Sequence, residues 1–263
     1  MSGGSYETLT VERGGRVARV WLDRPAVRNA FDAVMIRELR RGLEELGRDD
    51  GVRVVVLSGR GPAFCAGADL NWMREIVRFS YERNLEESLD LAGALHDLYA
   101  LPKPTVARVH GPAIGGGTGF VSACDIVVAS TEAVFGLSEV KIGVVPAAIS
   151  PYVIRRMGES RARQYFLTGE RLDGRRAHET GLANIVAAPG ELDGAVEAVV
   201  ASLLSSGPEA LASAKELLRR VPGMDFEEAK RFTAEMIARL RVSAEAQEGM
   251  AAFLEKRKPK WAA

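Results

Sequence analysis

The sequence lacks an excess of charge of either sign and lacks any long apolar run. Its 263 residues carry 35 Lys and Arg against 35 Asp and Glu, for a formal net charge of +0. Nucleic-acid-binding proteins usually carry a basic surplus, so this balance argues against nucleic acid as a partner. No apolar run approaches the ~20 residues that span a membrane, which argues against a membrane partner. The opening "MSGGSYETLT" has neither the basic start nor the apolar centre of a secretion signal, so we expect a cytoplasmic protein.

Cysteine and histidine are also scarce, which argues against several kinds of catalytic centre. The two cysteines, Cys65 and Cys124, are expected to be buried, reduced thiols. The three histidines lie far apart without a metal-ligand spacing such as HExxH, so we expect no metal site. A GxSxG elbow and a lysine-containing phosphate loop are both missing. Zinc hydrolases, serine hydrolases and P-loop proteins are therefore disfavoured.

Strands alternate with helices in the first two thirds of the chain, which predicts an α/β core. Strands are predicted within residues 6–13, 16–23, 52–59, 104–111 and 124–130. Asp32 is expected to cap a helix. From about residue 170 onward the apolar spacing predicts helices, with segments around 192–203, 208–218, 226–240 and 250–254. These last helices are expected to form either a lid on the chain's own core or a contact face for other subunits.

Two loops that follow buried strands combine small side chains with flexible backbone. They are "FCAGADL" at 64–70 and "GGGTG" at 115–119, and neither carries a clear nucleophile. Both can offer backbone N–H groups, and two such groups aimed at one point form an oxyanion hole. Downstream, Glu139 stands in the mostly apolar segment "AVFGLSEVKIGVVP". Burial there would raise the pKa of its carboxyl and suit it to acid/base chemistry; the alternative is an ordinary surface carboxylate.

Four segments together resemble the enoyl-CoA hydratase/isomerase (crotonase) superfamily: "FCAGADL", "GPAIGGGTGFVSACDIVVAS", "FGLSEVKIGVVP" and "LTGERLDGRRAHETGLAN". Within it, "LSEVKIGVVPAAISPYVIRRMG" is most similar to bacterial 3-methylglutaconyl-CoA hydratases. The resemblance implies a spiral of ββα repeats over residues 1–200 and a helical trimerisation region over 201–263. It also implies an acyl-CoA substrate, no cofactor beyond the coenzyme A of that substrate, and a homo-oligomer that is a trimer or a hexamer built as a dimer of trimers.

The resemblance also assigns residues to the site. The backbone N–H groups of Ala68 and Gly116 would hold the thioester oxygen, and Glu139 would be the acid/base. Six more residues would contact coenzyme A: Ala66, Asp69 and Leu70 along its path, Arg28 near its phosphates, and Lys256 and Lys258 from this or a neighbouring subunit. The resemblance does not assign a residue to a distal substrate carboxylate; Arg74, Arg78 and Tyr152 are candidates, although an ordinary surface role is favoured for each.

One position departs from the family pattern. Typical hydratases of this family carry a first glutamate in "GGGxE" and a second 20 residues later; Glu139 matches the second, but Gly119 stands at the first. Room for a branched or carboxylated substrate is the expected reason for this glycine.

Three reactions remain open with one carboxylate. In the first, which we favour, Glu139 alone hydrates 3-methylglutaconyl-CoA, or a similar branched enoyl-CoA, to 3-hydroxy-3-methylglutaryl-CoA in leucine or isoprenoid catabolism. In the second, it shuttles a proton as a Δ3,Δ2-enoyl-CoA isomerase. In the third, the protein dehydrates a 3-hydroxy-3-methylglutaryl thioester on an acyl carrier protein in polyketide synthesis. A non-catalytic role in RNA binding is disfavoured, because "RELRRGLEELGRDDGVR" mixes arginine with acidic residues.

Overall fold

A six-stranded sheet forms the centre of this computed structural model, which describes residues 5–262. Its strands lie in the order β1 (Leu9–Gly14), β2 (Val17–Leu22), β3 (Val54–Gly59), β4 (Thr105–Val109), β6 (Ile126–Ser130) and β9 (Ile185–Ala187). β1 and β2 form an antiparallel hairpin, and every later pair is parallel. β3 is buried along its whole length, as its uninterrupted apolar run predicts.

A smaller sheet lies beside the first and consists of β5 (Ala113–Ile114), β7 (Val134–Gly136) and β8 (Arg171–Asp173). β5 pairs with β7 in parallel, and β7 pairs with β8 antiparallel. Helices connect and cover the strands: α1 (Ala33–Arg48), α2 (Leu70–Ile76), α3 (Tyr81–Ala100), α4 (Gly116–Ala123), α5 (Ser150–Met157), α6 (Glu159–Thr168), α7 (Gly174–Glu179) and α8 (Leu192–Leu204). Three more helices follow them: α9 (Pro208–Arg220), α10 (Phe226–Arg241) and α11 (Ala244–Leu254).

Alternate residues of the strands pack into two separate hydrophobic cores, because successive side chains of a strand point to opposite faces of the sheet. One face of the large sheet packs on α1, α3, α4 and α5 and forms the main core. The other face is covered by α8, whose Leu192, Val196 and Val200 lie on valines of β2, β3, β4 and β6. The loops at 64–70 and 115–119 and the segment that contains Glu139 lie at the edge of the main core, which therefore fixes their positions.

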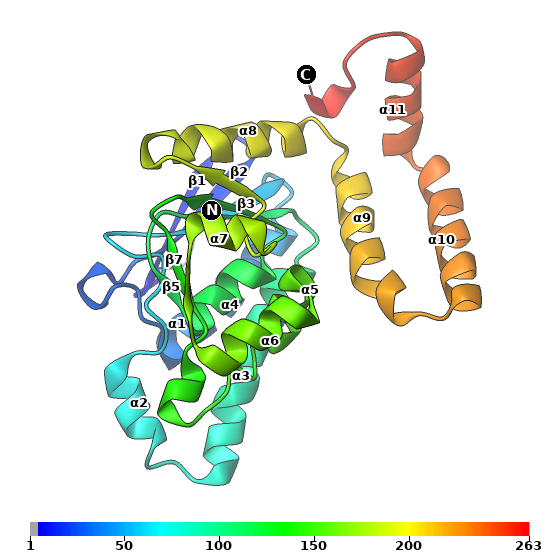
Figure 1. The fold of residues 1–263 in the computed structure, drawn as a ribbon. Coiled ribbons are helices and arrows are strands. Elements are labelled where there is room, and N and C mark those ends of the chain that lie inside the picture. Colours follow the sequence, from blue (N-terminus) through cyan, green and yellow to red (C-terminus); the bar gives the residue numbers. More distant parts are fainter. Residues whose placement is uncertain (1–4, 263) are drawn as a thin grey trace.

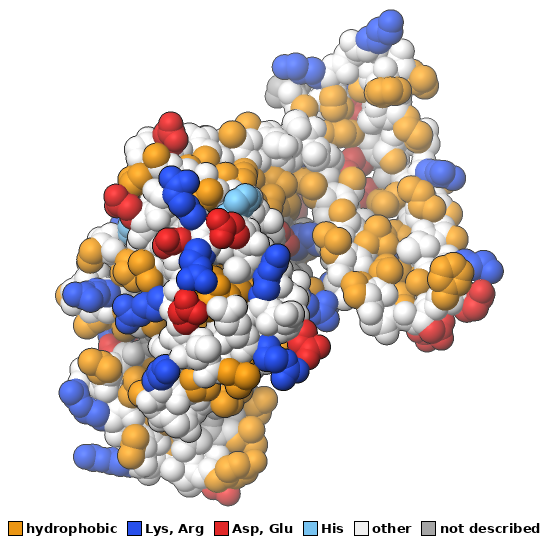
Figure 2. Space-filling view, viewed as in Figure 1, with side chains coloured by type: hydrophobic (Ala, Val, Ile, Leu, Met, Phe, Trp, Pro, Cys, Tyr) orange, Lys and Arg blue, Asp and Glu red, His pale blue; other side chains and the backbone are white. Residues whose placement is uncertain are grey.

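The C-terminal helices project away from this core (Figure 1). α9, α10 and α11 bury few side chains, and Figure 2 shows hydrophobic groups over their surface. α8 is one continuous helix that packs on the large sheet and runs across the predicted boundary at residue 200, and the division into a core and a trimerisation region stays a prediction. Residues 1–4 of the predicted core and residue 263 of the predicted trimerisation region lie outside the described residues. The start of "MSGGSYETLT" is therefore not described.

Most of the predicted elements are confirmed, including all five strands, the Asp32 cap of α1 and the four C-terminal helices. The expectation of helices alone after residue 170 was wrong, because β8 and β9 are short strands of three residues each, below the length at which alternation is visible. Cys65 and Cys124 are buried and free, and burial raises the pKa of each thiol to about 12. Within residues 5–262 no single helix has both the length and the apolar character to cross a membrane, although one pair bent by 104°, Pro189–Leu204 with Pro208–Gly223, reaches both together.

Candidate active site

Backbone hydrogen bonds hold the two glycine-containing loops side by side. The Cys65 N–H donates to the Pro112 carbonyl at 3.0 Å, and the Ile114 N–H donates to the Cys65 carbonyl at 2.9 Å. On its other side the first loop is bonded to Phe31, whose N–H donates to the Gly67 carbonyl at 2.8 Å. Segments far apart in the sequence are thus fixed next to one another, which brings Ala68 and the start of α4 to the same cavity.

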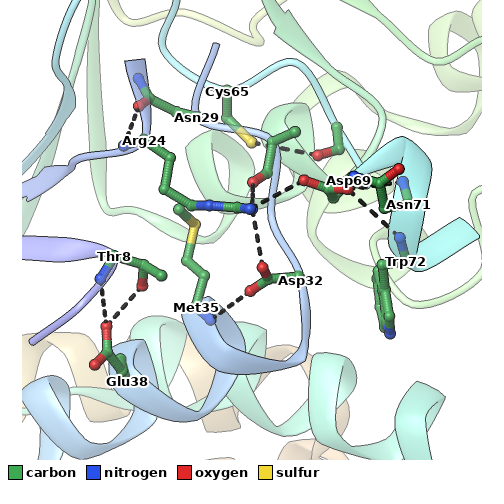
Figure 3. A network of polar contacts seen from close by, with 12 residues as sticks. Thr8, Arg24, Asn29, Asp32, Met35, Glu38, Cys65, Asp69, Asn71 and Trp72 are labelled. Atoms are coloured by element: carbon green, nitrogen blue, oxygen red, sulfur yellow. Dashed lines mark hydrogen bonds and ion pairs between the residues drawn. The ribbon is translucent and has the colours of Figure 1, made fainter. Parts of the chain in front are cut away.

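Arg24 ties this loop to the start of two helices (Figure 3). Its guanidinium lies 3.0 Å from Asp32 Oδ2 and 3.0 Å from Asp69 Oδ2. Asp32 caps α1 by accepting from the Met35 N–H, and Asp69 caps α2 by accepting from the Asn71 N–H. Since Asp69 follows Ala68 directly, this network fixes the backbone that carries the Ala68 N–H.

Glycine is required at the entrance to α4. Gly115 has φ 54 and ψ −121, a combination that residues with a Cβ rarely adopt. A Cβ on Gly116 would lie 2.5 Å from the Phe31 ring, so that position has no room for one. Within residues 5–262, neither the Ala68 N–H nor the Gly116 N–H donates a hydrogen bond. Two free backbone donors therefore remain at this cavity, one of them at a helix N-terminus, whose dipole favours negative charge.

Glu139 lies against the same glycine loop. It begins a short 3₁₀ turn, Glu139–Ile142, that ends at Gly143 in the left-handed region. A Cβ placed on Gly115 would lie 3.1 Å from Glu139 Oε1, and Oε2 is buried with no hydrogen-bond partner among the described residues. This desolvation raises the pKa of the Glu139 carboxyl above its ordinary value. The carboxyl can therefore exchange a proton with a group held at the two free N–H donors.

Glu139, Ala68 and Gly116 share one cavity of about 460 Å³. Most of its wall is apolar and comes from α2, α3 and the segment after the 3₁₀ turn, including Trp72, Ile76, Leu91, Val145 and Ile149. None of the residues lining it within the described chain is Lys, Arg or His. The arrangement suits an uncharged acyl chain whose carbonyl oxygen reaches the two N–H groups.

Gly119 does not leave room for substrate, contrary to expectation. A Cβ on Gly119 would lie 2.1 Å from Ile149 Cγ2 and 2.9 Å from Ile149 Cβ. The side chain of Ile149 thus fills the space in which a first glutamate would stand. Gly119 is accordingly explained by packing within the protein.

The residues expected along coenzyme A differ in where the structure places them. Ala66 and Leu70 line the cavity, but Asp69 does not, because its carboxylate is turned to the α2 cap and to Arg24. Arg28 is exposed beside the loop, and its carbonyl accepts from the Ala66 N–H at 3.0 Å.

The remaining expected contacts lie elsewhere. Lys256 and Lys258 are exposed beyond α11, at the opposite end of the molecule from α2 (Figure 1). They do not line the cavity of their own chain, and their contact with coenzyme A stays a prediction. Arg74, Arg78 and Tyr152 do not line the cavity either.

A larger groove of about 930 Å³ lies between α1 and α3, away from both glycine loops. Its charges are largely paired, since Arg40 binds Asp90 and Asp97, and Arg48 binds Glu44. The described residues hold no group of three or more His, Cys, Asp or Glu that could bind a metal ion.

Sequence reasoning missed three residues at this site: Arg24, Glu87 and Ile149. Arg24 stands in "DRPAVRNAFD", where no local signal shows that it bridges two helix caps. Glu87 is one of several acids on α3, yet it is the one that lines the cavity. Only helical periodicity, applied to α3 from Leu91 and Leu95, could have placed Glu87 near the buried face.

Known proteins resemble this chain over almost its full length. The model of the family described as enoyl-CoA hydratase/isomerase matches residues 12–263. A Thermus thermophilus relative, provisionally named an enoyl-CoA hydratase, is 42% identical over 253 residues, 96% of this chain and 100% of the relative. The 2,3-dehydroadipyl-CoA hydratase of Escherichia coli is 34% identical over 261 residues, 95% of this chain and 97% of the relative. The crystal structure of an enoyl-CoA hydratase from Shewanella pealeana shares 42% identity with a TM-score of 0.93, covering 97% of this chain and 96% of that one, which confirms the predicted α/β crotonase fold.

Proposed function

The chain belongs to the enoyl-CoA hydratase/isomerase family, and we propose that it is an enoyl-CoA hydratase, a hydro-lyase, in which Glu139 is the only acid/base carboxylate. The observation that carries this proposal is the meeting of one desolvated carboxylate with two free backbone N–H groups in a single apolar cavity. The Ala68 and Gly116 N–H groups would hold the thioester oxygen of the substrate. Each well-placed donor of this kind typically stabilises the transition state by about 3 kcal/mol.

The proposed reaction needs one proton carrier. Glu139, ionised, takes a proton from water while the water oxygen bonds to C3 of the enoyl group. The electron pair of the C2–C3 double bond moves toward the thioester oxygen, where Ala68 and Gly116 stabilise the negative charge. Glu139 then returns the proton to C2, which gives the 3-hydroxyacyl-CoA and restores the carboxylate. The same steps in reverse dehydrate the product.

The acyl group that fits best is short or branched and uncharged. The resemblance to 3-methylglutaconyl-CoA hydratases favours a branched substrate, and a role in leucine or isoprenoid catabolism depends on that choice. A glutaconyl chain, however, ends in a second carboxylate, for which the cavity wall offers no cation. A buried, unpaired charge is costly, so we place uncharged branched enoyl thioesters ahead of 3-methylglutaconyl-CoA.

Isomerisation is the second candidate, and the packing of Ile149 favours it. Moving a double bond between C3 and C2 requires only one carboxylate that carries a proton between C2 and C4. Ile149 fills the place of a first glutamate and so removes a group that would orient water. Glu139 and the two N–H donors would serve this reaction unchanged.

A panel of acyl-CoA substrates separates these functions. We expect loss of the conjugated-enoyl absorbance with crotonyl-CoA and 3-methylcrotonyl-CoA, and slower turnover of 3-methylglutaconyl-CoA. Gain of that absorbance with a 3-enoyl-CoA, without any hydration of the 2-enoyl-CoA, would assign the protein as an isomerase instead. Binding of all these thioesters without any change in absorbance would contradict both functions.

We also propose that the C-terminal helices associate with other copies of the chain. Leu218, Phe226, Val242, Phe253 and Leu254 lie on α9–α11 or at their ends and are 73–83% exposed. Large apolar side chains left exposed along three helices that project from the core are expected to mark a contact surface. The exposed Lys256 and Lys258 follow the last of them, so association would carry these cations to a second chain.

Phe253→Glu, combined with Leu254→Glu, is expected to convert the oligomer to a monomer while the sheet stays folded. The added charges would be buried without partners if the surface associates. Light scattering after size-exclusion chromatography measures the mass, with a trimer or hexamer expected for the unaltered chain. Glu255→Gln, next to the same surface, is the control and leaves the mass unchanged. A monomeric unaltered chain would refute the proposed association.

A further inference from the structure

One buried carboxylate of the cavity has no part in the proposed reaction. Glu87, on α3, is 7% exposed and lies on the same wall as Leu91 and Ser88. Its partner is Arg83, one turn earlier on the helix, whose side chain is half exposed and which also binds Glu86. Glu87 thus places a carboxylate at the edge of an apolar cavity, paired with an arginine that does not itself line the cavity.

The position of Glu87 along α3 separates it from the reacting atoms. Leu95 Cδ2 lies 3.4 Å from the place of a Cβ on Gly119, one turn along α4 from Gly115, so this turn of α3 packs on the helix that carries the Gly116 N–H. Glu87 precedes Leu95 by eight residues, which is about 12 Å along a helix. It therefore lies toward the part of the cavity formed by α2 and the beginning of α3, where Ile76 and Met73 stand. An acyl chain bound by its thioester would direct its far end there.

We propose that Glu87 is a specificity-determining residue that excludes acyl groups with a negatively charged far end. This inference rests on the proposed function, because it assumes that the cavity receives the acyl chain. Repulsion of a competing ligand is a common source of specificity, and like charges in a poorly solvated site are strongly unfavourable.

Nothing else on the wall offsets this charge. The Asn84 amide, one turn before Glu87, already donates to the Ile76 and Phe79 carbonyls. Its donors are thus used to hold α2 against α3. Among the lining residues of the described chain no Lys, Arg or His faces Glu87. A carboxylate brought to this end of the cavity would meet the Glu87 carboxylate, whose counter-ion Arg83 lies outside the cavity lining.

The test uses two saturated acyl-CoA ligands of equal chain length, so that it does not depend on turnover. Hexanoyl-CoA and adipyl-CoA differ only in the terminal carboxylate, and their dissociation constants are measured by titration calorimetry. The unaltered protein is expected to bind hexanoyl-CoA at least 10-fold more tightly. Glu87→Gln is expected to reduce this ratio to threefold or less by tightening adipyl-CoA alone. Glu87→Met, which keeps the length of the side chain and suits a helix, is expected to reduce it too.

Glu86→Gln is the matched control, because Glu86 binds the same Arg83 but is exposed and does not line the cavity. It should leave the ratio unchanged. Equal affinities of the unaltered protein for the two ligands, or an equal effect of Glu86→Gln and Glu87→Gln, would overturn the inference. Failure of the proposed function has a different signature: the ligand ratio responds to Glu87 as stated, but no enoyl-CoA of the panel is hydrated.

Discussion

Glu139→Gln is expected to lower kcat for hydration by about 10²- to 10⁴-fold, the usual contribution of a positioned acid/base group. Affinity for hexanoyl-CoA should stay within about threefold, since the amide keeps the shape of the side chain and the two backbone donors are untouched. Glu132→Gln, which replaces an exposed glutamate, is the control and should retain full activity. Near-normal turnover by Glu139→Gln would contradict the proposal that this carboxyl transfers the proton from water to C2.

The raised pKa of Glu139 gives this prediction a second readout. As a base the carboxyl must be ionised, so kcat/KM for hydration should fall as the pH drops through an apparent pKa above the ordinary glutamate value of about 4.3. The folded protein holds this proton more tightly than the unfolded chain. Its contribution to stability is therefore present below the unfolded pKa and is lost as the pH rises through the folded pKa.

The raised pKa of Glu139 also predicts how the Glu139→Gln variant changes the stability of the protein. Above its raised pKa the Glu139 carboxyl of the unaltered protein is a desolvated carboxylate, with Oε2 unpartnered among the described residues, whereas the variant keeps a neutral amide. The variant should thus have an equal or higher Tm above that pKa, and the difference should shrink as the pH falls below it and both side chains become neutral. A variant that is both inactive and clearly less stable at pH 7 would indicate a structural role for Glu139 instead of a chemical one.

Gly119→Glu is expected to destabilise the protein and to leave hydration of crotonyl-CoA no faster. The new Cβ would meet Ile149 Cγ2 at 2.1 Å, and a carboxylate would be forced into a packed core. Overpacking of this kind costs about 1–3 kcal/mol before the buried charge is counted. For a chain of this size we expect Tm to fall by roughly 6–12 °C, measured by scanning fluorimetry.

A second substitution tests whether the clash with Ile149 causes the destabilisation by Gly119→Glu. Combining Gly119→Glu with Ile149→Gly removes both clashing atoms, and we expect it to recover part of the lost Tm and to exceed Gly119→Glu in hydration. Ile149→Gly alone measures the cost of the cavity. A faster, fully stable Gly119→Glu single variant would show that the space was open to substrate, as the sequence suggested.

Local patterns were enough to predict much of this protein. Alternation and apolar runs placed five of the six strands of the large sheet, and the glycines with their neighbours marked both loops that carry the free N–H groups. Glu139 was found from its apolar surroundings, and the structure places it against the second loop with its pKa raised. These features could be read because secondary structure, turns and desolvation depend mainly on residues close in sequence.

The tertiary structure decided what local patterns do not contain. Periodicity shows that a side chain is buried but not which distant side chain it meets, and so it could not reveal that Ile149 fills the space beside Gly119. The same limit concealed Glu87 on the cavity wall and turned Asp69 from an expected ligand contact into a helix cap held by Arg24. Close packing across the core joins residues that are tens of positions apart. The sequence by itself therefore determined most of the elements and singled out Glu139 as the proposed acid/base residue, and only their packing decided the shape and charge of the cavity.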